Sequence, residues 1–249
     1  MKITIITANF NREKTLARTI ESVLNQTHNQ VEYIIIDGKS SDSSLEIIES
    51  YREKFKEKGY EYKYISERDS GIYNAMNKGI RMATGDIIGI IGSDDWYELE
   101  ALEKVNFEFE KNLNLKMTFG ILRTVKKGEF NKVIGSYHGF AIGQHPTVFL
   151  KKEIYDIYMF DESYRIAADT DLLLKLKKLN IEKKFIDKII TNFTEDGISS
   201  TDFLGTKLEH IKANFKAGEI SRRKKYILIL KAFLRYLRIK IKEFFKGEK

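Results

Sequence analysis

Carboxylate side chains occur in three short segments of the 249-residue sequence where the surrounding residues predict loops. Asp37 lies in IIIDGKSSD, Asp94 and Asp95 lie in GSDD, and Asp169 lies in ADTD. A carboxylate at a strand end can accept a hydrogen bond from a base or a ribose. Adjacent carboxylates repel each other, and a divalent cation that bridges to a diphosphate relieves this repulsion. Asp169, at the predicted start of a helix, has the chemistry of a general base for an incoming hydroxyl.

Each of these segments also has a purely structural interpretation. Asp42 alone would cap the helix that follows Asp37, and Asp95 would cap a helix over Trp96–Phe109. The agreement among the three segments favours metal binding by the second one. For Asp169, capping and catalysis stay open on its own motif.

The first hundred residues alternate between strand and helix patterns. Such alternation is typical of a mostly parallel sheet with helices on both faces, in which ligands bind beyond the carboxyl ends of the strands. The predicted strands are Lys2–Thr7, Val31–Asp37, Tyr60–Ser66 and Asp86–Ile91, and the predicted helices are Thr15–Asn25, Asp42–Glu57 and Ile72–Ala83. Asp37 and Asp94 therefore lie at the carboxyl ends of two strands.

The second half of the sequence has a less regular pattern. Its predicted elements are strands over Leu115–Val125 and Lys132–Tyr137, joined around Lys127–Gly128, a helix over Asp169–Leu179 and a strand pair over Lys183–Thr194. No repeat or low-complexity linker divides the chain. We therefore expect one domain over residues 1–218 and a tail over residues 219–249.

The net charge of +7 is concentrated in the tail, because residues 222–249 carry +9 and the rest carries −2. Apolar residues recur there at helical spacing, with basic residues on another face. The apolar set is Tyr226, Leu230, Phe233, Leu237, Ile241 and Phe244, and the basic set is Lys231, Arg235, Arg238 and Lys242. Such a helix suits an anionic membrane surface, or it packs on its own domain or on a second subunit. We favour the membrane, and expect no nucleic-acid partner because no reader motif accompanies the charge.

Other features of the sequence exclude whole classes of site. The chain contains no cysteine, which rules out disulfides, thiolate catalysis and zinc sites of the Cys type. Gly38 and Lys39 resemble the end of a P-loop, but Tyr33 stands where that motif needs a glycine, and no GxGxxG follows the first strand. The N-terminal residues resemble a strand rather than a signal peptide, and no apolar stretch reaches the ~18 residues of a spanning helix. We expect a cytoplasmic protein.

Several ordered motifs over roughly residues 1–200 together resemble the family 2 glycosyltransferases. ITANFNREKTLARTIESVLNQT is similar to the family's opening strand, loop and helix, and EYIIIDGKSSD to its uridine-contacting segment. SERDSGIYNAMNKGIRMATGD is similar to the segment that leads into its metal motif, and GSDD stands at its DxD position. AADTDLLLKL stands where the family usually has Glu-Asp before a helix. ISERDSGIYNAMNKGI and IAADTDLLLKL are especially similar to the branch that builds bacterial exopolysaccharide, capsule and O-antigen.

The resemblance implies an α/β protein with the GT-A fold, a Rossmann-like, mostly parallel nucleotide-binding sheet flanked by helices. It implies metal-dependent, inverting transfer from a nucleotide-sugar, with a UDP-sugar expected, to a hydroxyl of a glycan or lipid-linked saccharide in cell-surface polysaccharide biosynthesis. Asp94 would bind Mn²⁺ or Mg²⁺, and Asp169 would be the catalytic base. The implied donor-binding residues are Asn9, Arg12, Asp37, Asp69, Asn77 and Asp95. Lipid-linked acceptors would place the protein peripherally at the inner face of the plasma membrane.

Two positions depart from the family's pattern. Gly92 replaces the first Asp of the DxD motif, so that Asp94 would carry the metal, with Asp95 as a helper or ribose contact. Ala168 replaces the Glu of the Glu-Asp pair, which puts any acceptor contact of that Glu in doubt. His145, in GQHPTVF, would assist the diphosphate or the acceptor, or it would be a hydrogen-bonded loop residue.

Two other functions account for less of the sequence. A nucleotidylyltransferase would need a glycine-rich loop after the first strand, and ANFNREK contains no glycine. A non-catalytic membrane or nucleic-acid binder would use the basic tail. That function would leave Asp37, Asp94 and Asp169 without a role.

Overall fold

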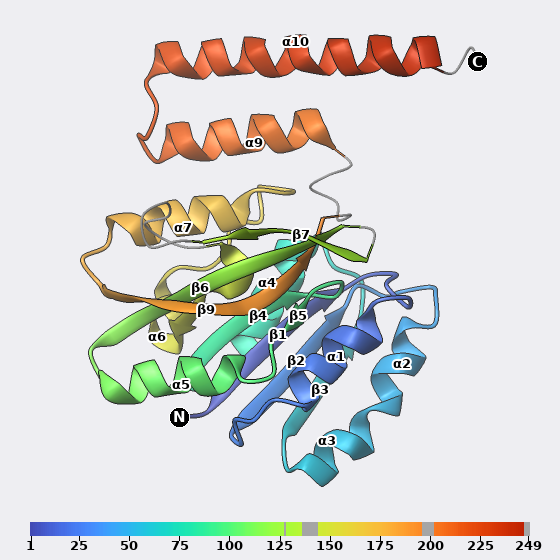
Figure 1. The fold of residues 1–249 in the computed structure, drawn as a ribbon, viewed down its shortest axis with the longest axis vertical. Coiled ribbons are helices and arrows are strands. Elements are labelled where there is room, and N and C mark those ends of the chain that lie inside the picture. The colour runs from blue at the N-terminus through green and yellow to red at the C-terminus, as the bar shows by residue number, and fades with distance from the viewer. Residues whose placement is uncertain (127, 136–143, 196–201, 247–249) are drawn as a thin grey trace.

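The computed structural model describes residues 1–126, 128–135, 144–195 and 202–246, with side chains as far as Lys242. Its centre is one large sheet with the strand order β3-β2-β1-β4-β8-β6-β9-β5, and β7 pairs with β6 (Figure 1). Helices lie on both sides of the sheet (Figure 1). This confirms the predicted α/β class.

The N-terminal half forms the parallel part of the sheet. Its strands are β1 (Ile3–Asn9), β2 (Val31–Asp37), β3 (Glu61–Ser66) and β4 (Ile87–Gly92). The helices between them are α1 (Leu16–Leu24), α2 (Ser44–Ser50), α3 (Arg52–Lys58) and α4 (Ile72–Met82). Every residue of β1 and β2 is buried, because helices cover both faces.

The pairing register brings the strand ends together. Asn9 pairs with Asp37, Asp37 with Ser66, and Ala8 with Gly92. The carboxyl ends of all four parallel strands therefore share one edge. The chain places β2 and β3 on one side of β1 and β4 on its other side, so the direction in which strands are added reverses between β1 and β4. In open α/β sheets this is where ligands bind.

The C-terminal half extends the sheet with mixed pairing. Its strands are β5 (Trp96–Tyr97), β6 (Leu115–Lys126), β7 (Glu129–Ile134), β8 (Phe149–Lys151) and β9 (Glu182–Thr194). Its helices are α5 (Ala101–Lys111), η1 (His145–Thr147), α6 (Lys152–Ile157), α7 (Ala168–Lys178), α9 (Phe203–Lys216) and α10 (Arg222–Lys246). β8 runs antiparallel to β4 and β6, whereas β6 and β9 are parallel.

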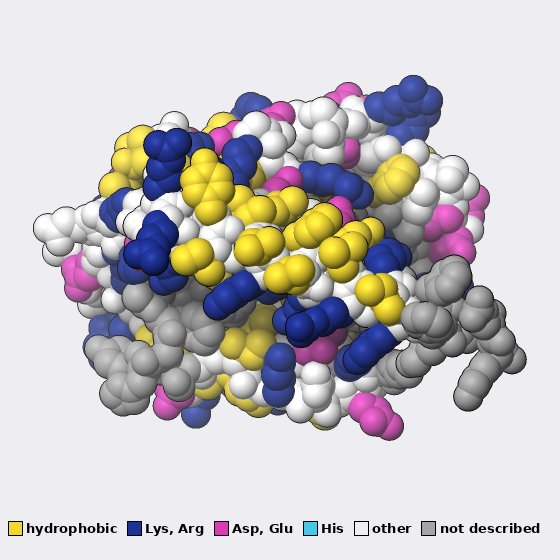
Figure 2. Space-filling model, turned by 90° about the horizontal axis from the view of Figure 1, so that it is seen from above, with side chains coloured by type: hydrophobic (Ala, Val, Ile, Leu, Met, Phe, Trp, Pro, Cys, Tyr) yellow, Lys and Arg dark blue, Asp and Glu magenta, His cyan; other side chains and the backbone are white. Residues whose placement is uncertain are grey.

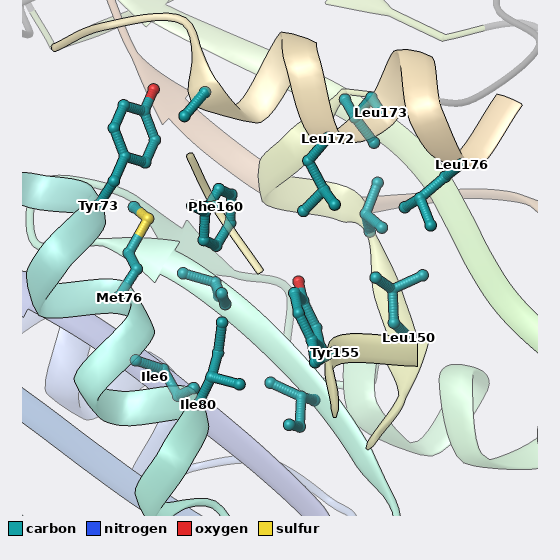
Figure 3. Close-up of a cluster of buried hydrophobic side chains, with 14 of the residues drawn as sticks. Ile6, Tyr73, Met76, Ile80, Leu150, Tyr155, Phe160, Leu172, Leu173 and Leu176 are labelled. Carbon is teal, nitrogen blue, oxygen red and sulfur yellow. The ribbon is translucent and has the colours of Figure 1, made fainter. Parts of the chain in front are cut away.

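Apolar side chains pack on both faces of the sheet. One cluster joins Ile6 of β1 to Met76 and Ile80 of α4 and to Leu172 and Leu176 of α7 (Figure 3). Gly79 permits this packing, because a Cβ there would lie only 2.4 Å from Cγ2 of Ile6. The close contact fixes α4, and with it the loop before α4, against β1.

Four predicted elements differ from the structure. The strand pair over Lys183–Thr194 is the single strand β9, in which the polar residues Asp187 and Lys188 fall at a register shift rather than at a turn. The helix over Asp42–Glu57 is divided into α2 and α3 at Tyr51.

The helix over Trp96–Phe109 begins only at Ala101, because Trp96 and Tyr97 form β5 against β9. The predicted strand over Lys132–Tyr137 is displaced toward the N-terminus as β7. Lys127 and Tyr137 lie outside the described residues.

The C-terminal helices form a layer of their own. α9 packs against α7, and α10 packs against α9 (Figure 1). Among the described residues, no helix has both the length and the hydropathy that crossing a bilayer requires. The division between residues 218 and 219 stays a prediction.

A buried carboxylate connects the amino ends of the parallel strands. Glu32 of β2 has no exposed surface and accepts hydrogen bonds from Oγ1 of Thr4 at 2.5 Å, Nζ of Lys63 at 2.5 Å, and both the backbone N–H and Oγ1 of Thr84 at 2.8 Å. Burial alone would raise the pKa of Glu32. The hydrogen bonds from Lys63, Thr4 and Thr84 outweigh it and lower the pKa from 4.5 to about 2.

We predict that Glu32→Gln lowers the free energy of unfolding at pH 7 by about 1–3 kcal/mol, because the variant loses the charge that these donors bind. The folded-state pKa is below the unfolded value, so the stabilisation is complete above 4.5 and is lost as the pH falls toward about 2. Urea unfolding should therefore show a smaller difference at pH 3 than at pH 7. Glu153→Gln, at an exposed ion pair with Lys116, serves as the control. An equal difference at both pH values would contradict this account.

Candidate functional site

Asp37, at the end of β2, is the centre of a buried hydrogen-bond cluster. Its Oδ1 accepts from Nδ2 of Asn9 at 2.8 Å and Oγ of Ser40 at 2.5 Å. Its Oδ2 accepts from the backbone N–H of Ser40 at 3.0 Å and Oγ of Ser66 at 2.6 Å. Four donors thus replace the water that this fully buried carboxylate has lost.

Asn9 presents an acceptor next to this cluster. Its Oδ1 is buried and has no hydrogen-bond partner among the described residues, while its Nδ2 is held by Asp37. Buried acceptors are normally satisfied, so an unpartnered one at a strand end is a place for an N–H group of a ligand. The following residue, Phe10, is 59% exposed although it lies at the end of a fully buried strand.

Asp69 lies beside the same cluster. Its Oδ2 is only 2.8 Å from the position that a Cβ on Gly38 would take, and its Oδ1 accepts from the backbone N–H of Gly71 at 3.0 Å. Gly38 N–H in turn donates to the carbonyl of Asn9 at 2.8 Å. Glycine at position 38 therefore allows the Asp69 carboxylate to approach the ends of β1 and β2.

The turn from Gly92 to Asp95 is held by α1 on one side and by β9 on the other. From α1, Nη2 of Arg18 donates to the carbonyl of Asp94 at 2.8 Å, and Oγ1 of Thr19 donates to the carbonyl of Asp95 at 2.6 Å. From β9, the Thr194 N–H donates to Oδ1 of Asp95 at 2.8 Å, and its Oγ1 donates to the carbonyl of Asp94 at 2.6 Å. This turn is rigidly anchored from two distant parts of the sequence.

The two acids of this turn lie in different environments. Asp95 is 3% exposed, and burial, followed by the adjacent Asp94 carboxylate, raises its pKa well above the ordinary value. The positive charges of Arg18 and Arg12 act in the opposite direction. Asp94 is half-buried. A Cβ at Gly92 would lie 2.9 Å from Oδ2 of Asp95 and 3.1 Å from Oδ1 of Asp94, so both carboxylates fold back over this glycine.

Asp94 and Asp95 can supply some, but not all, of the ligands that a hard cation needs. Carboxylate oxygens are the ligands that Mg²⁺ and Mn²⁺ prefer, and such ions commonly take one or two of them together with phosphates and waters. Within residues 1–126, 128–135, 144–195 and 202–246, no group of three or more His, Asp or Glu side chains has the geometry to hold a metal ion. The pair therefore fits an ion whose remaining ligands come from a phosphate and from water.

Asp169 lies in the first turn of α7 and is half-buried. Its Oδ1 accepts from the backbone N–H of Thr170 at 2.6 Å and from Oη of Tyr73 at 3.4 Å. Tyr73 belongs to the first turn of α4, so it connects Asp169 to the loop that carries Asp69. Desolvation lowers the pKa of His145, and the charge of Asp169 acts on this pKa in the opposite direction.

The structure does not bring Asn77 to this group. Its Nδ2 donates to the carbonyl of Phe160 at 3.0 Å and to Oε1 of Glu162 at 2.8 Å, and its Oδ1 accepts from the Phe160 N–H at 3.1 Å. Asn77 is 2% exposed and holds the segment before α7 against α4. Arg12, in contrast, is half-buried in the loop after β1, and its positive charge opposes the rise in the pKa of Asp95.

Two residues near the site were not predicted from the sequence. Phe10 carries no signal beyond being an aromatic residue directly after the first strand. Tyr73 lies inside the segment SERDSGIYNAMNKGIRMATGD, in which the predicted site residues are Asp69 and Asn77. Its hydroxyl lies between the carbonyl of Ile166, which is the nearer acceptor, and the carboxylate of Asp169. This position becomes clear only from the packing of α4 on the segment before α7.

The sequence was compared with models of known protein families. The model of "Glycosyl transferase family 2" matches residues 4–156. The chain belongs to this family. The matched residues include Asn9, Asp37, Asp69 and Asp94, and Asp169 lies beyond them.

Named relatives are similar over parts of the chain. Chondroitin synthase of Escherichia coli is 30% identical over 193 residues, which is 74% of this chain and 27% of that protein. The poly(ribitol-phosphate) beta-glucosyltransferase of Bacillus spizizenii is 35% identical over 130 residues, which is 50% of this chain and 20% of that protein. The chain thus spans less than a third of the length of these relatives.

Solved structures share the fold. TarS of S. aureus, residues 1–349 in complex with UDP-GlcNAc, superposes with a TM-score of 0.68 at 18% identity, covering 96% of this chain and 73% of that one. Mannosyltransferase PcManGT from Pyrobaculum calidifontis, in complex with GDP-Man and Mn²⁺, gives a TM-score of 0.69 at 14% identity, covering 93% and 68%. These likenesses confirm the expected GT-A fold.

Proposed function

We propose that the protein transfers a sugar from a nucleotide-sugar, with a UDP-sugar as the favoured donor, to a hydroxyl of a glycan or lipid-linked saccharide in cell-surface polysaccharide biosynthesis. The observation that carries the proposal is the strand register, which puts Asn9, Asp37 and Gly92 at one edge of the sheet. The family match and the nucleotide-sugars bound to TarS and PcManGT support it.

The donor's nucleoside would bind at the ends of β1 and β2. A uracil offers an N–H donor and a flat ring, and the site offers the unpartnered Oδ1 of Asn9 and the exposed ring of Phe10. Asp37 would act chiefly by holding Asn9 in place, and Asp69 by contacting the nucleoside from the α4 side. Arg12, in the loop after β1, would pair with the diphosphate.

Asp94 would bind Mn²⁺ or Mg²⁺ together with the donor's phosphates, and Asp95 would support it. When bound, such an ion offsets the negative charge that develops on the leaving diphosphate. The folded-back carboxylates over Gly92 fit this role, because they supply hard oxygen ligands without closing the coordination shell.

Asp169 would act as the general base. Its carboxylate would take the proton from an acceptor hydroxyl as that oxygen attacks the anomeric carbon on the face opposite the nucleotide, which inverts the configuration. Oη of Tyr73 lies 3.4 Å from Oδ1 of Asp169, and its single proton is shared between this carboxylate and the nearer carbonyl of Ile166. His145 would lie on the acceptor side, where its lowered pKa favours the neutral ring.

Nucleotide binding tests the donor and metal roles together. We predict that one of UDP, GDP and dTDP binds in calorimetric titrations with Mn²⁺, and that EDTA abolishes this binding. Asp94→Ala should weaken it about tenfold to a hundredfold, the equivalent of one charge-assisted contact.

Asp156→Ala is a matched control, because this exposed acid on α6 pairs with Lys152 at the opposite edge of the sheet. Equal affinity in Mn²⁺ and in EDTA would contradict the metal role. The absence of binding by all three nucleotides would contradict the donor role.

We also infer that α10 attaches the protein to the anionic inner face of the plasma membrane. Several of its apolar residues are exposed, and Figure 2 shows a band of apolar side chains bordered by Lys and Arg side chains. Leu230 is 59% exposed and Phe233 48%, and within residues 222–242 only Ala232 is buried. A surface that combines an apolar band with positive charge suits an interface between lipid tails and anionic headgroups.

Vesicle sedimentation tests this attachment. We predict that the protein sediments with vesicles containing phosphatidylglycerol and stays in solution with phosphatidylcholine alone. Leu230→Asp combined with Leu237→Asp should abolish sedimentation, because it places charge in the apolar band. Leu113→Asp, at a 72% exposed leucine outside α10, is the control and should behave as the unaltered protein does. Undiminished sedimentation of the double variant would contradict the membrane role of α10.

A further inference from the structure

The carboxylate of Glu209, on α9, lies at the start of α7. Its Oε1 accepts from the backbone N–H of Arg165 at 2.9 Å, and its Oε2 accepts from the backbone N–H groups of Ile166 at 2.7 Å and Ala167 at 3.0 Å. Three consecutive amides of the segment that leads to Asp169 thus converge on one side chain. That side chain comes from more than forty residues later in the chain.

The next residue on α9, His210, contacts Thr170, the residue after Asp169. A ring nitrogen of His210, Nδ1, lies 3.1 Å from Oγ1 of Thr170, at hydrogen-bond distance. Glu209 and His210 therefore hold the residues before and after Asp169. Tyr73 adds a third connection, because its hydroxyl donates to the carbonyl of Ile166.

The start of α7 has no side-chain cap of its own. Helices begin with unpaired N–H groups that a side chain at the N-cap usually satisfies. Here the N-cap residue is Ala167, which offers no side-chain acceptor. Glu209 binds instead the amides of the N-cap residue and of the two residues before it, and its negative charge also suits the positive end of the α7 dipole.

We propose that Glu209 is a positioning residue that holds Asp169 in the orientation needed for its role as the base. This inference rests on the proposed function, in which Asp169 takes the proton of the acceptor. Proton transfer requires close and directed approach, and small misplacements of a reacting group cost up to about a hundredfold in rate. Asp169 in α7 and Glu209 in α9 both lie beyond the segment that the family model matches.

Glu209→Gln is the informative variant. Gln keeps one oxygen and has nearly the same size, but its NH₂ group faces N–H donors where the second carboxylate oxygen was. Glu219→Gln is the matched control. Glu219 pairs with Lys177 at 3.0 Å, at the far end of α7, so this change weakens the contact between the C-terminal layer and α7 without touching the segment before Asp169.

Two measurements on the full chain test the proposal. Hydrogen exchange should accelerate about tenfold to a hundredfold at the amides of residues 165–167 in Glu209→Gln and stay unchanged in Glu219→Gln. Turnover is followed as nucleoside diphosphate release from UDP-glucose, UDP-N-acetylglucosamine and GDP-mannose with Mn²⁺. For the donor that is turned over, kcat should fall about tenfold to a hundredfold in Glu209→Gln, while KM for that donor changes little.

The outcomes separate the inference from the proposed function. If Asp169→Asn keeps full turnover, the assignment of the base is wrong. If Asp169→Asn is inactive but Glu209→Gln matches Glu219→Gln in both exchange and kcat, the positioning role is wrong. Accelerated exchange in Glu209→Gln with unchanged kcat would also overturn it, because the contact would then be structural only.

Discussion

Parallel pairing of β1 with β2 on one side and β4 on the other is the constraint on which the site depends. It aligns Asn9 with Asp37 and Ala8 with Gly92, residues that are 28 and 84 positions apart along the chain. A shift of one residue in either register would turn the side chains of that strand to the opposite face. The fully buried apolar residues of β1 and β2 oppose such a shift, because both faces of these strands are packed by helices.

Contacts from distant segments then hold the loops at this edge. Thr194 of β9 and Arg18 of α1 bind the turn at Asp94 and Asp95, and Gly38 lets Asp69 approach the end of β2. Asn77 and Tyr73 connect α4 to the segment before α7. Precise placement of a few polar groups by a rigid sheet and its helices is what an active site needs, and here most of these contacts involve backbone groups of the loops.

The sequence predicts the parallel half of the fold and its acids well. Continuous β-branched strands such as Val31–Asp37 have few alternative structures, and an acid directly after such a strand must lie at its carboxyl end. The predicted strand pair over Lys183–Thr194 is instead the single strand β9, which includes the polar residues Asp187 and Lys188. The structure accommodates them at a register shift opposite Gly120, a long-range pairing that local sequence does not reveal.

Individual roles were harder to predict than positions. Asn77 lies in a motif shared with the family, but only its partners at Phe160 and Glu162 show that it supports the fold. Phe10 and Glu209 carry no local signal, because an aromatic residue after a strand and a glutamate on a helix are each ordinary. Their significance depends on the exposure of Phe10 and on the amides of residues 165–167 that surround Glu209.

The most direct test of the central claim is an experimental structure of the protein with UDP and Mn²⁺. The account predicts uracil beside Asn9 and Phe10, the metal ion between Asp94 and the diphosphate, and Asp169 facing the space next to the terminal phosphate. Nucleotide bound at any other edge of the sheet, or metal coordination without Asp94, would contradict it.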